Sequence, residues 1–72
     1  MVRTYKVKYD KNLLSWIVTF DGSSQKSNFP RKRQAVKSAR SRASNYPKRT
    51  GKKAKLKVYN KDGSISETRT YS

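Results

Sequence analysis

The stretch PRKRQAVKSARSRASNYP, residues 30–47, decides the fold. Pro30 suits the first turn of a helix, because its fixed φ and missing N–H carry no penalty there. Behind it, apolar and small side chains recur at helical spacing: Ala35, Val36, Ala39, Ala43 and Tyr46. The pattern predicts a helix over about residues 31–45, ended by Pro47, whose alanines allow it to lie close to a sheet.

On both sides of this helix the sequence alternates with a period of two, which is typical of half-buried strands. Before it, strands are expected over residues 3–9 and 14–20, joined by a turn at 10–12, with a weak continuation over 25–29 after turn residues 21–24. After it, a strand over 55–59, a hairpin turn at 60–63 and a strand over 64–71 are expected. We therefore predict an α+β fold: one small domain, residues 1–72, an antiparallel sheet with one helix packed on one face, in the order β-β-α-β-β.

Positive charge dominates the chain. Nineteen lysines and arginines face four acidic residues, and fourteen of the basic ones fall between Gly22 and Lys61, where there is no acid. A net charge of +15 on 72 residues is self-repulsion that a bound polyanion would relieve. Solubility alone is the alternative explanation, but a small domain needs only a single-digit net charge for it.

Several classes of protein are disfavoured by what the sequence lacks. Histidine and cysteine are absent, and three of the four acids, Asp10, Asp21 and Asp62, have turn-forming reasons for their positions. No metal site, nucleophile with its base or phosphate-cradling glycine loop can be assembled, so we expect no enzyme, no cofactor and no small-molecule substrate. No apolar run approaches a membrane span, and we expect a cytoplasmic protein associated with the nucleoid.

A resemblance to a known family covers nearly the whole chain. It rests on these pieces in order: Tyr5-Lys6-Val7, Trp16-Ile17-Val18, Asp21-Gly22, Phe29 before Lys32, Ala35-Val36, Ala39-Arg40, Ala43, Leu56 to Ile65, and Thr70-Tyr71. In order and spacing they resemble the short prokaryotic family catalogued as domain of unknown function 2188. The resemblance implies a small α+β domain and brings no established activity, so no functional residue is carried over.

The chain departs from that family's pattern in its charge. Members usually have acids in the first helical turn and an apolar or acidic third strand, where this chain has Arg31 to Gln34 and the pair Lys55 and Lys57. A more distant likeness, carried by Trp16-Ile17-Val18, Asp21-Gly22 and Phe29, is to the arm-site DNA-binding domains of tyrosine recombinases, whose open sheet faces the major groove. This second likeness is an analogy of fold and does not fix a function.

Three surfaces compete for the polyanion. If the helix covers the sheet face made by Tyr5, Val7, Trp16, Val18, Leu56, Val58 and Ile65, the other face presents Thr4, Lys6, Lys8, Thr19, Lys55, Lys57 and Tyr59. The second surface is the helix column of Arg33, Lys37 and Arg40, and the third is a flexible basic loop at about 47–54 with Lys48, Arg49, Lys52 and Lys53. We favour the sheet with the loop, although lysines also serve ordinary solvation and edge protection of a sheet.

Function follows from these surfaces as a hypothesis. Lysines outnumber arginines, asparagines and glutamines on the favoured surfaces, which predicts binding to duplex DNA through phosphates with little sequence specificity. Such a protein would be nucleoid-associated or encoded by a virus or mobile element. The alternatives are RNA, for which Tyr59 and Ile17 form a sparse stacking platform, and an acidic protein surface on which the chain docks as an inhibitor or assembly factor. The short 64–71 strand could also pair between two copies in a homodimer.

Overall fold

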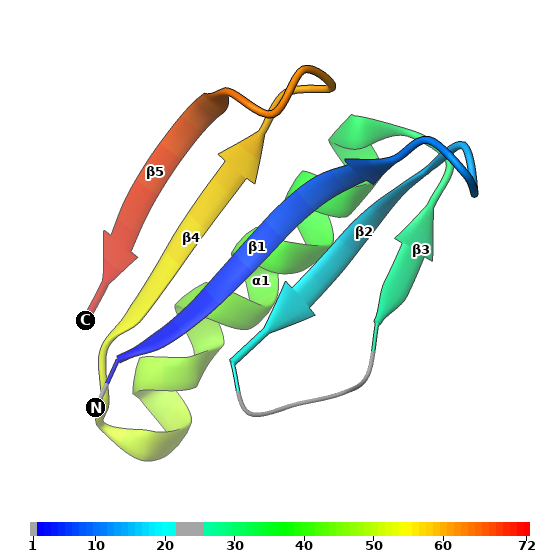
Figure 1. The fold of residues 1–72 in the computed structure, drawn as a ribbon. Helices are drawn as coiled ribbons and strands as arrows, with labels where there is room; N and C mark the ends of the chain where they lie inside the picture. Colours follow the sequence, from blue (N-terminus) through cyan, green and yellow to red (C-terminus); the bar gives the residue numbers. More distant parts are fainter. Residues whose placement is uncertain (1, 22–25) are drawn as a thin grey trace.

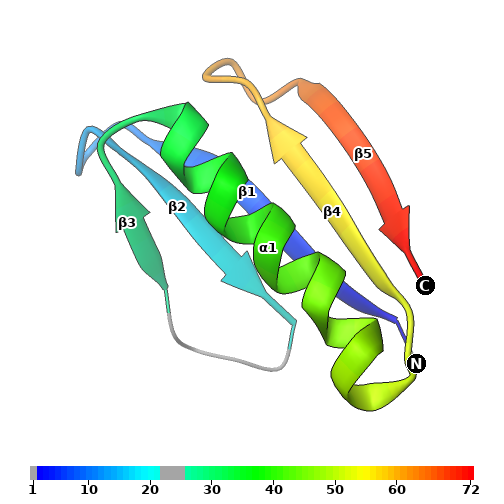
Figure 2. The same cartoon turned by 180° about the vertical axis from the view of Figure 1, so that it is seen from behind.

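The computed structural model describes residues 2–21 and 26–72, which form a five-stranded sheet with one helix lying across one face (Figures 1 and 2). In chain order the elements are β1 (Arg3–Asp10), β2 (Ser15–Phe20), β3 (Ser27–Phe29), α1 (Lys32–Thr50), β4 (Ala54–Tyr59) and β5 (Ile65–Tyr71). The α+β fold with its helix on one face is confirmed. The weak continuation predicted over 25–29 is the short strand β3, while the turn predicted at 21–24 lies largely outside the described residues.

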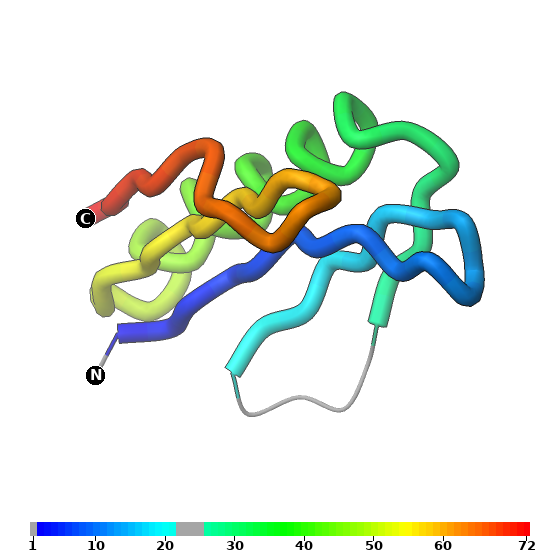
Figure 3. The backbone as a smooth tube through the Cα atoms, turned by 45° about the horizontal axis from the view of Figure 1, so that its top comes forward, coloured from blue at the N-terminus to red at the C-terminus, as the bar shows by residue number. Residues whose placement is uncertain are grey.

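The sheet is mixed, and the expectation of an antiparallel sheet was wrong at its centre. Its strand order is β3-β2-β1-β4-β5, in which β1 and β4 are parallel and the other neighbours are antiparallel. The reason is the helix: α1 rises about 28 Å over 19 residues and carries the chain back along the sheet. Thus β4 starts at the same end as β1, and Figure 3 shows the two hairpins joined through the helix behind them.

The core lies between α1 and the sheet face that α1 covers. Three alanines on α1 are fully buried, as the alanine pattern predicted. They pack against alternate residues of the three inner strands, β2, β1 and β4. The cluster comprises Tyr5, Val7, Trp16, Val18, Ala35, Ala39, Ala43, Tyr46, Ala54, Leu56 and Val58. Because small side chains face the sheet, the layers pack closely and a thin apolar content suffices to fill the space.

The helix runs five residues further than predicted. Pro47 lies inside α1, which ends at Thr50, so the predicted flexible loop at 47–54 was wrong for its first half. Tyr46 is 8% exposed and packs edge-on against Tyr5, which keeps this turn against the sheet. Gly51 then closes the helix at φ 73°, and its N–H donates to the Pro47 carbonyl at 2.8 Å.

Ile65 was expected in the core and lies outside it, 56% exposed. The pairing of β4 with β5 shifts by one residue between Val58 and Tyr59, so Ile65 pairs with Tyr59 while Glu67 pairs with Val58. A bulge of this kind exchanges the faces of the residues beyond it. Ile65 therefore shares the uncovered face with Tyr59, and Glu67 points to the helix side.

Candidate nucleic-acid interface

The uncovered sheet face brings four predicted lysines together on its two central strands. Lys6 and Lys8 alternate with core residues on β1, and Lys55 and Lys57 do so on β4. The parallel register pairs Lys6 with Lys57, and Thr4 with Lys55. Neighbouring strands lie about 4.8 Å apart, so Lys6 and Lys57 are like charges on adjacent backbones. Sequence reasoning placed both on one face but could not make them neighbours.

No acidic side chain neutralises these lysines. All four acids lie in the described residues, and the ion pairs found there join only Glu67 to Arg40 and to Arg69. Asp10, at the end of β1, accepts hydrogen bonds from the Asn12 and Leu13 amides within its own turn. Like charges on facing positions destabilise a sheet. This lysine block therefore costs folding free energy that no described carboxylate offsets.

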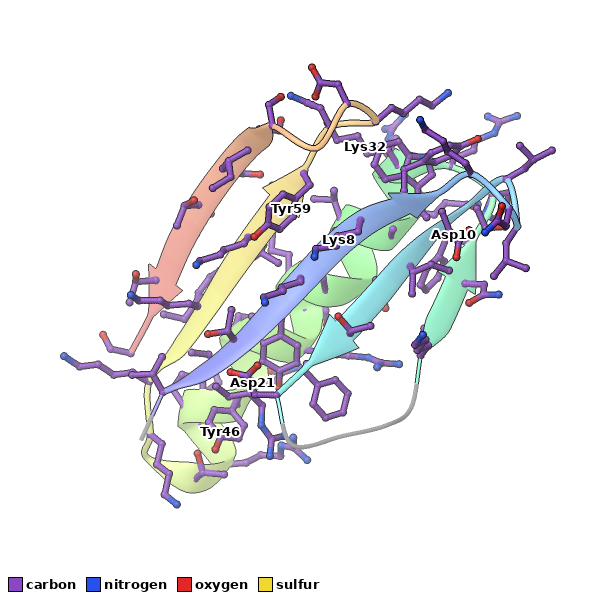
Figure 4. The ribbon with its side chains drawn as sticks, viewed as in Figure 1. Lys8, Asp10, Asp21, Lys32, Tyr46 and Tyr59 are labelled. Atoms are coloured by element: carbon purple, nitrogen blue, oxygen red, sulfur yellow. The ribbon has the colours of Figure 1, made fainter. Side chains whose placement is uncertain are left out.

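Tyr59 and Ile17 are less available on this face than the sequence suggested. The Lys8 ammonium lies 5.1 Å from the centre of the Tyr59 ring, a contact that can be followed in Figure 4. Ile17, which pairs with Lys8 and Asn28, is only 8% exposed. A base stacking on this sheet would find little free aromatic or apolar surface, so the face is cationic and hydroxyl-bearing rather than a stacking platform.

The helix column lies on the opposite side of the sheet. Arg33, Lys37 and Arg40 are exposed on α1, as predicted, and share a shallow hollow with Val36. One of the three is paired: Arg40 Nη2 lies 3.4 Å from Glu67 Oε1 across the gap to β5. The bulge in β5 explains this pair, because it turns Glu67 toward the helix. The column is therefore partly neutralised, whereas the lysine block is not.

The four cations assigned to a loop belong to two different elements. Lys48 and Arg49 stand in the last turn of α1, while Lys52 and Lys53 lie in the short connection to β4. The helical position brings Lys48 and Arg49 beside Arg3 and Arg42, two residues that sequence reasoning missed as site residues. The spacing of seven between Arg42 and Arg49 was the available signal, hidden by the early helix end predicted at Pro47.

Glu67 makes the stability of the fold depend on pH. The hydrogen bond from Arg69, helped by the charges of Arg69 and Arg40, holds the pKa of Glu67 below its ordinary value of 4.5. A carboxyl whose pKa is lower in the folded chain stabilises the fold above the unfolded pKa, and this contribution is lost as pH falls through the folded pKa.

We expect the free energy of unfolding of the wild type to decrease below pH 4.5, and that of Glu67→Gln to decrease less over the same interval. The difference is small, because the Glu67 side chain is 28% exposed and the arginines beside it are more exposed still. Urea denaturation at a series of pH values measures it. Identical acid sensitivity in the two proteins would rule out this role for Glu67.

Two other features are absent from the part of the chain that the structure describes. Residues 2–21 and 26–72 contain no group of three or more His, Cys, Asp or Glu side chains placed to hold a metal ion. They also contain no helix long and apolar enough to cross a membrane.

Comparison with known proteins gives one match. A family model described as an uncharacterized protein conserved in bacteria matches residues 5–71, nearly the whole chain. No curated protein and no solved structure matches the chain. The likeness to recombinase arm-site domains therefore gains no support from these comparisons, while the family resemblance in the sequence is confirmed.

Proposed function

This chain belongs to DUF2188, a family of uncharacterized proteins conserved in bacteria, and since the family brings no activity we propose from the chain's own surface that it binds duplex DNA through phosphates. The observation that carries the proposal is the block of Lys6, Lys8, Lys55 and Lys57 on two adjacent central strands, unpaired by any acid in the described residues. Phosphates neutralise such a block and release their counterions, which is the main source of affinity for DNA.

The width of the sheet favours phosphates over base edges as the contacted groups. Five strands span four spacings, about 19 Å, whereas the major groove is about 12 Å wide. The whole face cannot enter the groove and would lie across the backbone. Within the described part of that face, Asn28 is the one Arg, Asn or Gln side chain, and the lysines are flexible point charges without the fixed fork geometry of arginine. Binding with little sequence preference follows from both points.

A duplex suits this face better than a single strand. Single-stranded RNA and DNA are held by aromatic rings on which bases stack, and Tyr59 already carries the Lys8 ammonium over its ring. An acidic protein surface remains the competing partner, because a lysine ammonium also donates to carboxylates. The two partners separate in one experiment.

Fluorescence anisotropy with a mixed-sequence duplex tests the proposal. Four lysine contacts predict that the logarithm of the binding constant falls with the logarithm of salt concentration with a slope of about −3.6, or roughly a hundredfold between 50 and 200 mM salt. Polyglutamate at equal charge concentration is the matched polyanion and is expected to compete poorly. Absence of duplex binding at low salt would sink the proposal, and equal competition by polyglutamate would favour an acidic protein partner instead.

A further inference from the structure

A second cationic surface lies at the far end of the helix. A hollow of about 610 Å³, which we call the cradle, is lined by Arg3 from β1 and by Arg42, Asn45, Lys48 and Arg49 from α1, over the rings of Tyr5 and Phe20. No acid pairs with these four cations in the described residues. Asp21, the carboxylate next to Phe20 in the chain, accepts instead from the Thr4 amide at 3.2 Å.

Arg3 is held ready for an oxyanion. Its guanidinium carbon lies 4.4 Å from the centre of the Tyr46 ring and 5.2 Å from that of Phe20. Stacking on rings orients the planar guanidinium while its N–H donors stay available at the edge, the geometry that binds phosphate oxygens in pairs. The two rings therefore hold Arg3 in place, whereas a cation that serves only solubility needs no such contact.

Attraction of cations to the negative end of the helix dipole explains only part of the positive charge around the cradle. Lys48 and Arg49 stand in the last turn, where such attraction is worth about 0.3–1 kcal/mol each. Arg42 lies about two turns earlier and Arg3 is on a strand, so neither benefits in this way. Stacking on the two rings gives Arg3 a folding contribution of about 0.5–1 kcal/mol. Arg42 has neither explanation, and no ion pair in the described residues involves it.

The cradle and the lysine block lie on opposite sides of the sheet. Helix α1 covers one side of the sheet (Figures 1 and 2). Tyr5 belongs to the core cluster on that side and Phe20 packs against it, whereas Lys6 and Lys57 alternate with core residues and are on the uncovered side. The Cα atoms of the domain span 36 × 22 × 18 Å. Wrapping one duplex around so small a body needs far more than the 40–90° bend that already costs about 1–6 kcal/mol.

We propose that the cradle is a second phosphate-binding surface and that one copy of the chain bridges two duplexes, one on each side. The bridge rests on the proposed function, because the first duplex occupies the lysine block. In this proposal the charges at the end of the helix bind a second duplex and do not extend the contact with the first.

A pull-down between two duplexes tests the bridge. One mixed-sequence duplex is fixed to beads, and a second, fluorescent duplex is recovered only when the protein joins them. The wild type is expected to recover the fluorescent duplex at low salt. Arg42→Glu with Arg49→Glu is expected to lower recovery by about tenfold or more, because two attractive charges become repulsive. Single-duplex affinity, measured by anisotropy in about 0.1 M salt, should fall by less than about threefold, since charges beyond a Debye length of about 10 Å are screened there.

Arg33→Glu with Lys37→Glu is the control, since it makes the same change of charge near the other end of α1 and should lower recovery by no more than a few fold. Recovery that survives Arg42→Glu with Arg49→Glu would show bridging by paired copies using two lysine blocks, and overturns the cradle. A wild type that binds single duplexes but recovers no second duplex overturns the bridge and leaves the proposed function standing. Circular dichroism checks that each variant is folded.

Discussion

Lys55→Glu combined with Lys57→Glu is expected to weaken duplex binding by about a hundredfold or more. At the dielectric constant of water two unit charges 4 Å apart interact by about 1 kcal/mol, so reversing two attractive contacts costs about 4 kcal/mol before screening by salt. The slope of affinity against salt should also fall by about two, one unit for each lost phosphate contact.

The same variant should fold as well as the wild type or better. Lys57 lies beside Lys6 in the parallel register, so a glutamate there replaces a repulsion by an attraction worth about 0.2–1 kcal/mol. Thermal denaturation and anisotropy on the same samples separate the two effects. Arg33→Glu with Lys37→Glu makes an equal change of charge on the helix and is expected to weaken binding only a few fold. If that variant abolishes binding instead, the helix column and not the lysine block contacts DNA.

Leu56→Ala is expected to remove a large part of the stability. Leu56 is fully buried on β4 and contributes to the core cluster, and truncation of such a leucine costs about 2–5 kcal/mol. A chain of 72 residues has a total stability of about 4–11 kcal/mol. The midpoint of thermal unfolding should drop by about 8 °C or more, as measured by circular dichroism.

Ile65→Ala is the matched control, because it shortens an aliphatic side chain on the adjacent strand. Ile65 is 56% exposed, so its truncation should change stability by less than about 0.5 kcal/mol. A loss comparable to that of Leu56→Ala would place Ile65 back in the core and contradict the bulge between Val58 and Tyr59.

The sequence was sufficient to predict the features that alternation and helical spacing control, such as which residues face the core. Tyr5 with Val7, and Leu56 with Val58, point to the core because a strand exposes its faces with a period of two. The side-by-side placement of β1 and β4 was not predictable, since any neighbour that covers their apolar face would satisfy the same pattern. The prediction of an antiparallel sheet assumed that β1 and β4 pair as the strands of a hairpin do. Their relative direction is set instead by the helix that connects the two hairpins.

The predictions that were wrong concern residues at which packing overrides local sequence rules. Proline usually ends a helix, but the burial of Tyr46 against Tyr5 keeps the chain helical past Pro47. This places Lys48 and Arg49 beside Arg42. Ile65 fits an alternating strand, and only the one-residue shift in pairing puts it outside. The lysines on β1 and β4 were assigned to the correct face because their positions depend on alternation alone.

The parallel pairing of β1 with β4 also governs the order in which the fold can form during synthesis. The β1–β2 hairpin emerges first, but the other edge of β1 stays unpaired until the helix and then β4 have been made. Contacts between segments so far apart in the chain slow folding, and an open strand edge is where nascent chains aggregate. Lys6 and Lys8 stand on that strand, and their positive charges disfavour edge-to-edge pairing between two incomplete chains, before any ligand is bound.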